Sequence, residues 1–175
     1  MLTPEQRFTC MSHNRAKNTG PELLLRQALW RRGFRYRVND KRLPGTPDIV
    51  LPKFRSVIFV NGCFWHGHKD CKYYSVPKTN TEFWIAKIAR NQERDQEVWR
   101  KLEAKGWSVI ILWECQIKKA FLEETIGRVA AEIVRNGETF RATQERRREA
   151  RKVYLYERKE RKAREQSFLS EVKNL

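Results

Sequence analysis

The chain has 175 residues, and 40% of them are hydrophobic, so it can bury the core of one domain of ordinary size. Its 37 basic residues outnumber its 21 acidic residues and give a formal net charge of +16, which favours a polyanionic partner, nucleic acid before an anionic membrane surface. No apolar run reaches the roughly 18 residues that a membrane span requires, and the first residues lack the apolar segment of a signal peptide, so we expect a cytoplasmic protein without a membrane partner.

Residues 1–18 come first in chain order and form a basic arm with few apolar side chains. A helix is predicted directly after this arm, because Thr19 and Glu22 have the spacing of a capping box. Its leucine-rich stretch provides an apolar face, and Gly33 suits the cap at its C-terminal end.

Three short extended segments follow this helix, and Pro-Gly and Pro-Lys turns separate them: 34–38, 47–51 and 55–60. A long helix is predicted over 81–105, and the nearly continuous apolar stretch 107–113 has the pattern of a strand that is buried on both faces. A further helix is expected over 117–135, ending at Asn136-Gly137. This order of elements predicts an α/β fold in which helices flank a mixed sheet.

The composition changes beyond Gly137. Residues 138–175 contain 12 lysines and arginines and 7 glutamates, but few large apolar side chains. We therefore divide the chain into the arm 1–18, a main domain 19–137 and a charged helical tail 138–175.

A metal site is predicted from a short segment with C-x4-H-x2-C spacing, which places three metal ligands close together: Cys63, His68 and Cys71. Cys115 follows the buried strand 107–113 and becomes a fourth ligand if that strand pairs near 55–60. Three sulfurs and one imidazole suit a structural zinc ion with no open position. His66 is the alternative histidine ligand, Cys10 is the poorest candidate, and free, partly buried thiols are the other interpretation.

Two carboxylates occupy positions where a carboxylate is costly. Asp48 stands at the start of an apolar strand, either as a turn residue or as a metal ligand like that of magnesium-dependent nucleases of the PD-(D/E)xK type. Asp95 shares one face of the long helix with four apolar residues: Ile85, Ile88, Trp99 and Leu102. It either pairs with an arginine or holds a histidine, and His66 is the histidine that the zinc set leaves free.

Two aromatic side chains, Phe64 and Trp65, lie inside the segment that carries the predicted zinc ligands. One interpretation is that they pack into the core. The other is that they act as rigid wedges that enter a base stack and open it.

These residues belong to an ordered set of segments at near-constant spacing over residues 8–118: Met11–Glu22, Leu43–Asp48, Val57–His66, Thr81–Ile88, Asn91–Asp95 and Trp113–Cys115. In this set the chain resembles the very short patch repair (Vsr) DNA mismatch endonucleases, a branch of the restriction-endonuclease-like fold. The resemblance implies a strand-specific nick in duplex DNA beside a thymine mispaired with guanine.

The resemblance also implies a role for each residue of the catalytic site. The Asp48 carboxylate and the backbone carbonyl of Val60 bind Mg²⁺, and Glu22 helps to organise the metal-bound waters. His66 is the general base, and Asp95 is its carboxylate partner.

Further residues match the zinc and DNA-contacting positions of the family. The structural zinc ligands are Cys63, His68, Cys71 and Cys115. The aromatic residues that wedge into DNA are Phe64, Trp65 and Trp84, and Met11 on the arm wedges from the opposite groove.

The chain departs from the family at several places. Asn61 stands where the best-known form has a histidine that assists at the phosphate, so it acts only as a neutral hydrogen-bond partner. The loop at Lys69-Asp70-Cys71 is one residue longer, and the E-x-K motif of the broader fold is missing. The tail from about 138 onward matches none of the family segments named above, and we expect it to serve nonspecific DNA binding or a partner.

The leading interpretation is an Mg²⁺-dependent mismatch nickase with structural Zn²⁺, acting as a monomer, with repair proteins as a further class of partner. A related nuclease that acts on foreign or modified DNA is the second interpretation. The third is a non-catalytic, zinc-bearing DNA-binding module, which needs none of Asp48, His66 and Asp95.

Overall fold

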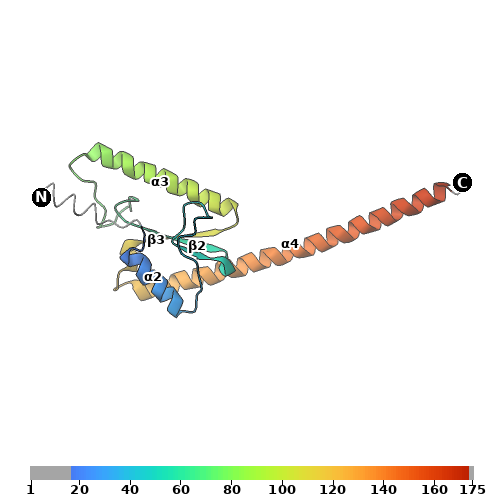
Figure 1. Cartoon of the computed structure of the whole chain (residues 1–175), viewed down its shortest axis with the longest axis horizontal. Helices are drawn as coiled ribbons and strands as arrows, with labels where there is room; N and C mark the ends of the chain where they lie inside the picture. The colour runs from blue at the N-terminus through green and yellow to red at the C-terminus, as the bar shows by residue number, and fades with distance from the viewer. Residues whose placement is uncertain (1–16, 174–175) are drawn as a thin grey trace. The chain divides into compact units, whose positions relative to one another are not determined.

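The structure, a computed structural model, describes the backbone of residues 17–173 and the side chains of residues 17–164. Its elements in chain order are α2 (Gly20–Arg31), β1 (Ile49–Leu51), η1 (Pro52–Phe54), β2 (Ser56–Asn61), α3 (Thr81–Ala104), β3 (Ser108–Trp113), η2 (Glu114–Ile117) and α4 (Leu122–Lys173) (Figure 1). The chain divides into two compact units, Met1–Asn136 and Gly137–Leu175. The predicted arm lies almost wholly outside the described residues, together with Cys10 and Met11, and the division into arm, domain and tail remains a prediction.

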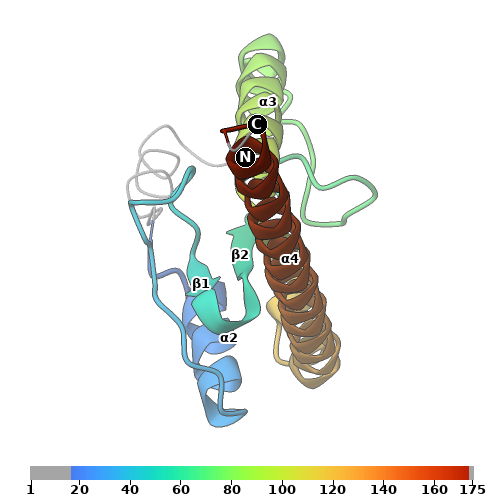
Figure 2. The same cartoon turned by 90° about the vertical axis from the view of Figure 1, so that its right-hand side faces the viewer.

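The centre of the first unit is a three-stranded sheet in the order β1-β2-β3. β1 pairs with β2 antiparallel (Figure 2), and the register places Ile49 opposite Ile58. β2 pairs with β3 in parallel, which brings Asn61 opposite Trp113. The mixed sheet that the order of elements predicts is therefore confirmed. The parallel pairing carries the C-terminal ends of β2 and β3 to the same edge of the sheet.

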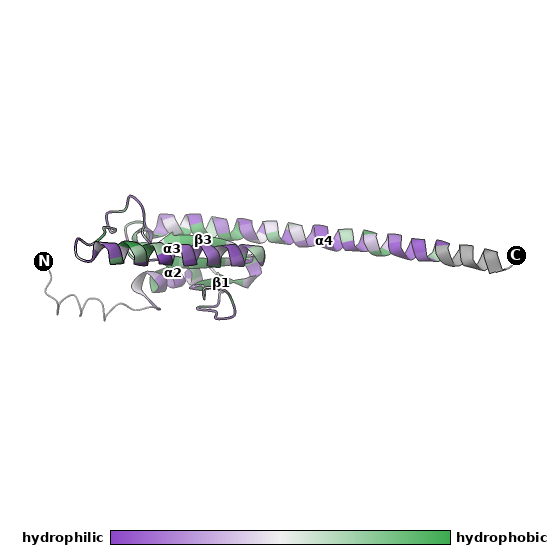
Figure 3. Cartoon of the chain, turned by 90° about the horizontal axis from the view of Figure 1, so that it is seen from above, coloured by the Kyte–Doolittle hydropathy of each residue, from purple (hydrophilic) through white to green (hydrophobic). Residues whose placement is uncertain are grey.

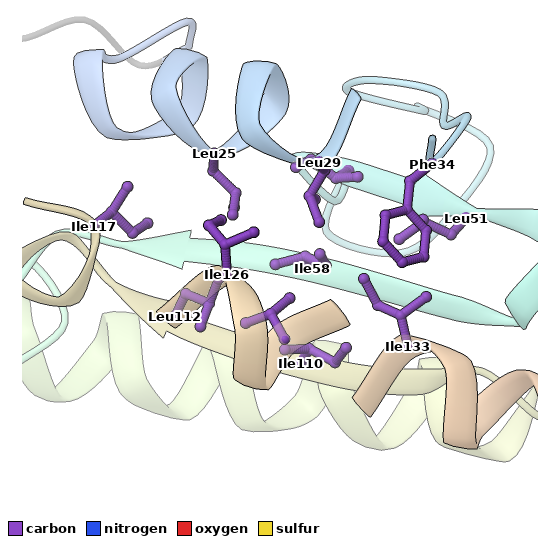
Figure 4. Close-up of a cluster of buried hydrophobic side chains, with 12 residues drawn as sticks. Leu25, Leu29, Phe34, Leu51, Ile58, Ile110, Leu112, Ile117, Ile126 and Ile133 are labelled. Carbon is purple, nitrogen blue, oxygen red and sulfur yellow. The ribbon is translucent and has the colours of Figure 1, made fainter. Parts of the chain in front are cut away.

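Helices cover both faces of this sheet. On one face, α2 and the first turns of α4 bury an aliphatic core against the strands, as Figure 4 shows for Leu25, Leu29, Ile58, Ile126 and Ile133. On the other face, Leu102 of α3 packs with Val50 and Val57. Alternate residues of β1 and β2 thus face opposite layers, as the pleat of a strand requires.

The start of α2 is fixed by the predicted capping box. Thr19 Oγ1 accepts a hydrogen bond from the Glu22 backbone N–H at 3.4 Å, and the Glu22 carboxylate accepts one from the Thr19 backbone N–H. The two bonds satisfy N–H groups that the first turn of a helix leaves without partners. They also turn Glu22 toward the sheet, where it is buried.

Two expectations about local structure were wrong. The segment 34–38 forms one isolated bridge, between Arg37 and Val50, because a turn at Asn39, with φ of 48°, carries the chain away from β1. Ile85 is 54% exposed although it shares a helical stripe with the buried Ile88, because only the later turns of α3 pack against the sheet.

The helix predicted over 117–135 begins later and ends much later. A 3₁₀ turn occupies Glu114–Ile117, and α4 then runs from Leu122 through Gly137 to Lys173. A glycine within a helix costs about 1 kcal/mol, and the arginine, glutamate and alanine residues that follow it are strong helix formers, so the helix continues. Of the helices in the described part of the chain, none is long and apolar enough to cross a lipid bilayer.

Candidate active site and metal centre

The loop after β2 is a tight structure held by its own backbone. The His68 N–H donates to the Cys63 carbonyl at 2.9 Å, and the His66 N–H donates to the Gly62 carbonyl at 3.2 Å. Gly67 has a φ of +64°, and a Cβ added there would lie 2.6 Å from the Gln92 amide nitrogen on α3. Glycine adopts this conformation without strain, and any larger residue would have to displace the Gln92 side chain.

Helix α3 holds the same loop from outside. The Asn91 side-chain amide donates to the Trp65 carbonyl at 2.9 Å, and the Gln92 amide donates to the His66 carbonyl at 3.0 Å. These bonds fix the backbone on which His66 stands, so the position of its imidazole is set by α3 as well as by β2.

Four ligand atoms converge beside this loop, and all lie within 4.8 Å of one another: those of Cys63, His68, Cys71 and Cys115. His68 Nδ1 lies 3.4 Å from the Cys63 sulfur and 3.5 Å from the Cys115 sulfur. The His68 ring stacks on Trp113 of β3, with 4.1 Å between the ring centroids and 4° between their planes. The structure thus brings the four predicted ligands together, with His68 rather than His66 as the imidazole.

Burial disfavours the thiolate form of two of these cysteines. Burial raises the pKa of the Cys63 thiol to about 12 and also raises that of Cys115, whereas a backbone hydrogen bond with Tyr73 lowers the pKa of Cys71. A cation reverses the cost of buried thiolates, because it supplies the charge that they lack. The nitrogen-to-sulfur distances are close to the edge of about 3.6 Å of a tetrahedral zinc site, so the four residues fit a closed site for such an ion.

Asp48 stands just before β1 and reaches across to β2. Its carboxylate accepts a hydrogen bond from the Val60 backbone N–H at 2.8 Å. Burial raises the pKa of Asp48 to about 6, the Val60 N–H opposes that shift, and the neighbouring Glu22 adds to it. A carboxylate in this position favours a bound cation, because a cation lowers the cost of ionising it.

Arg26 is a site residue that the sequence did not indicate. Its guanidinium donates to the Glu22 carboxylate at 2.9 Å and to the Asp48 carbonyl at 3.2 Å, and it is only 8% exposed. It joins α2 to the start of β1 and neutralises a buried carboxylate. The i, i+4 spacing from Glu22 was the available signal, but that spacing is common on surfaces and does not indicate burial.

His66 and Asp95 form the second polar pair of the site. His66 Nδ1 is hydrogen-bonded to the Asp95 carboxylate, and both side chains are mostly buried. Arg94 lies 3.7 Å from the other oxygen of Asp95 but is largely exposed, so the histidine is the main partner. With Nδ1 engaged, Nε2 is the nitrogen that remains to exchange a proton.

An open hollow of about 920 Å³ collects these groups on one side of the first unit. Its lining includes the residues predicted for the catalytic site: Glu22, Asp48, Val60, Asn61, His66 and Asp95. Lys17, Trp99 and Glu114 also line it and were not predicted as site residues. Glu114 accepts the Cys63 backbone N–H at 3.0 Å and thereby joins the hollow to the thiol cluster.

Asn61 is the buried residue of this lining with an unused donor. It is 4% exposed, and its amide nitrogen has no hydrogen-bond partner among the residues that the structure describes. An unpaired buried donor is costly, so the hollow has a place for an acceptor beside Asn61.

The predicted wedge residues form one partly exposed aromatic cluster. Phe64, Trp65 and Trp84 pack edge to face, with ring centroids 5.2 to 5.9 Å apart. Phe83 extends the cluster beside Trp84 and is 55% exposed. The cluster therefore packs mainly on itself, and Met11, the fourth predicted wedge, lies outside the described residues.

Comparison with known proteins relates this site to a family. The family model described as DNA mismatch endonuclease Vsr matches residues 1–73. The DNA mismatch endonuclease Vsr of Escherichia coli is 45% identical over 102 residues, which cover 58% of this chain and 65% of that protein. The Type II nicking enzyme V.NmeAIP of Neisseria meningitidis is 46% identical over 134 residues, which cover 76% of this chain and 95% of the relative.

The chain belongs to the Vsr family. A further relative, the Type II nicking enzyme V.XorIIP of Xanthomonas oryzae, is 47% identical over 116 residues, which cover 66% of this chain and 85% of that protein. As a Vsr-family member the chain is an endonuclease, and the hollow with its two polar pairs is the candidate for its active site. The catalytic, metal-binding and DNA-binding roles of the individual residues remain predictions.

Removal of one sulfur tests the thiol cluster. We expect the purified protein to carry one zinc ion per chain, and Cys115→Ala to lower the zinc affinity at least about 100-fold. Cys10→Ala, which removes the cysteine that does not belong to the predicted ligand set, is the matched control and should leave the affinity unchanged. Metal analysis with chelator competition measures both, and zinc retention by Cys115→Ala at full affinity would contradict the assignment.

The raised pKa of Asp48 has a consequence for stability without Mg²⁺. Between pH 4 and pH 6 the folded state keeps a proton that the unfolded state has released, so the free energy of unfolding falls as pH rises through this window. Asp48→Asn keeps an acceptor for the Val60 N–H and removes the effect. Urea unfolding should show equal stability at pH 4 and a variant about 2 kcal/mol more stable at pH 7, whereas a variant that is less stable at pH 7 contradicts the prediction.

Proposed function

We propose that the protein nicks one strand of duplex DNA beside a T:G mismatch, with Mg²⁺ as the catalytic ion and Zn²⁺ as a structural ion. Family membership makes it an endonuclease, and the proposal adds the target, the strand and the metals. The observation that carries it is the hydrogen-bonded pair His66 and Asp95 in one hollow with the buried carboxylate of Asp48. A restriction-endonuclease-like fold and a cytoplasmic monomer belong to the same proposal.

In this proposal His66 is the general base. Asp95 holds the imidazole with its proton on Nδ1, so Nε2 has the lone pair that can take a proton from water. The Asp95 carboxylate then offsets the positive charge of the imidazolium. Asn91 and Gln92 keep the loop backbone in place, so the imidazole does not need to reorient at the moment of proton transfer.

Asp48 and the backbone carbonyl of Val60 are the proposed protein ligands of Mg²⁺, a hard cation that prefers oxygen. When bound, such an ion supplies charge that stabilises the transferring phosphate. Glu22 is held by Arg26 and by the capping box, and it would help to organise the waters of a bound ion. The role of Arg26 is to offset the charge of this second carboxylate through their ion pair.

Asn61 supplies a neutral donor. Its unpartnered amide suits a phosphate oxygen, and unlike a histidine it keeps the same charge at every pH near neutrality. The aromatic cluster of Phe64, Trp65 and Trp84 supplies flat, rigid side chains that suit stacking on bases opened at a mispair. Trp65 belongs to both regions, because it also lines the hollow.

A related nuclease with another DNA target is the second candidate. It is favoured by the relatives, several of which are named type II nicking enzymes rather than mismatch endonucleases. The two candidates share the chemistry of Asp48 and His66 and differ only in what the DNA-contacting residues select. A non-catalytic DNA-binding module is no longer a candidate, because the chain belongs to a family of nucleases.

A strand-resolved nicking assay tests the target and the chemistry together. With Mg²⁺, the protein should nick the T strand of a T:G duplex at least about 100-fold faster than a paired duplex, and EDTA should stop the reaction. Asp48→Ala and His66→Ala should each slow nicking at least about 1,000-fold. Glu93→Ala, an exposed acid on α3, is the control and should leave the rate unchanged.

Each failure in this assay has its own meaning. Equal nicking rates on paired and mismatched duplexes would contradict the mismatch target but not the nuclease activity. A panel of methylated and branched duplexes would then identify the substrate. Full activity of Asp48→Ala would contradict the proposed catalytic site.

Asn61 is tested by two substitutions. Asn61→Ala should slow single-turnover nicking by about 100-fold and change the affinity for uncut DNA less than about threefold, because a donor to the developing charge acts mainly in the transition state. In Asn61→His, the nicking rate should gain a component that declines as the pH rises from 6 to 8, because the introduced histidine loses its positive charge. The wild-type amide has no such pH dependence. An unchanged nicking rate for Asn61→Ala would contradict the proposed role of the Asn61 amide as a donor to the phosphate.

A further inference from the structure

The second unit of the chain, Gly137–Leu175, has a surface that the proposed chemistry does not use. All its described side chains lie on α4, and every one from Glu145 to Arg164 is exposed. Figure 3 shows this part of α4 as mostly hydrophilic. The tail predicted from composition is therefore helical, and its charge pattern can be placed on the faces of a helix.

Most basic residues of this helix lie on one side, and the glutamates lie outside that side, as do Arg146, Arg161 and Arg164. Successive residues are about 100° apart around an α-helix, which puts one set of basic residues within about half of the circumference. We name this set the basic face: Arg147, Arg148, Arg151, Lys152, Arg158 and Lys159. Arg141 and Lys162 extend the basic face at its two ends, and the glutamates at 145, 149, 157 and 160 lie outside it.

This arrangement is unfavourable for a helix that has only water as its neighbour. Such helices gain stability by pairing opposite charges at i, i+4, and like charges at that spacing destabilise them by a few tenths of a kcal/mol. The basic face contains two like-charged pairs at i, i+4: Arg147 with Arg151, and Arg148 with Lys152. Within the described side chains, Lys152 is the member of the face with an ion pair, to Glu149 at 3.2 Å.

The length and charge of the face match one class of partner. From Arg141 to Lys162 the helix advances about 32 Å at 1.5 Å per residue, and one turn of duplex DNA is about 34 Å long. An anionic membrane surface fits less well, because the side of the helix away from the basic face bears glutamates, and a helix lying in a bilayer interface needs an apolar face there.

We propose that the basic face of α4 binds the phosphate backbone of duplex DNA without regard to sequence. The surface adds to affinity for DNA as such, whereas discrimination of a target belongs to residues that reach the bases. The proposal rests on the proposed function only in that the enzyme acts on duplex DNA, and it does not require a mismatch or a nick.

The test is the salt dependence of binding to a fully paired duplex by full-length protein. Each phosphate contact contributes about 0.9 to the slope of log affinity against log salt concentration. We expect the double variant Arg147→Gln, Arg151→Gln to reduce the slope by about 2 and to weaken binding roughly tenfold or more at 100 mM KCl. Fluorescence anisotropy between 50 and 200 mM KCl measures both quantities.

The matched control removes two arginines from the other side of the same helix. Arg146→Gln, Arg164→Gln causes the same loss of net charge and should leave the slope within about half a unit of wild type. Far-UV circular dichroism checks that both double variants keep their helix. Equal slopes for the two double variants would overturn the proposal, and so would binding to phosphatidylserine vesicles as tight as binding to DNA.

Nicking of a T:G duplex, measured separately at saturating protein, distinguishes this proposal from the proposed function. The basic-face variant should nick at the wild-type rate once the DNA is bound. If the protein does not nick the T:G duplex but shows the expected salt slopes, the proposed function is wrong and the proposal of a DNA-binding face is supported.

Discussion

The convergence of three thiols and one imidazole is the constraint on which the rest of the site depends. Cys63, His68 and Cys71 belong to one loop, and Cys115 follows β3, so a single site joins the loop to the end of the neighbouring strand. The parallel pairing of β2 and β3 brings these segments to the same edge of the sheet. Because His66 stands inside that loop, the cluster sets where the proposed base lies without touching its chemistry.

The hollow gathers groups whose burial is costly unless they are paired. Asp48 has a raised pKa, and the Asn61 amide lacks a partner among the described residues. Residues that weaken the empty protein in this way commonly belong to functional sites, because the ligand offsets the cost. Arg26, which lacks any motif of its own, supports two of these groups through its bonds to the Glu22 carboxylate and the Asp48 carbonyl.

Much of the fold followed from local rules. Thr19 and Glu22 predicted the start of α2 because a capping box depends only on nearby residues, and the apolar run before Trp113 predicted β3 because burial on both faces leaves a continuous pattern. The bridge at Arg37 and the passage of α4 through Gly137 were missed, since the first depends on the course of the chain after a turn and the second on the residues that follow the glycine. The same holds for the candidate site. Helical spacing predicted that Asp95 faces inward, but the burial of Arg26 and the contact of Glu114 with Cys63 depend on segments far apart in the sequence.

The tautomer of His66 is the most direct test of the proposed catalytic site, because Asp95 is proposed to hold the imidazole for proton transfer. Nitrogen-15 NMR of histidine-labelled, zinc-loaded protein near pH 8, with His66→Gln used to assign the signal, reports which ring nitrogen carries the proton. The proposed role of Asp95 requires a proton on Nδ1, lying toward Asp95, and an unprotonated Nε2. A proton on Nε2 with Nδ1 unprotonated would contradict it.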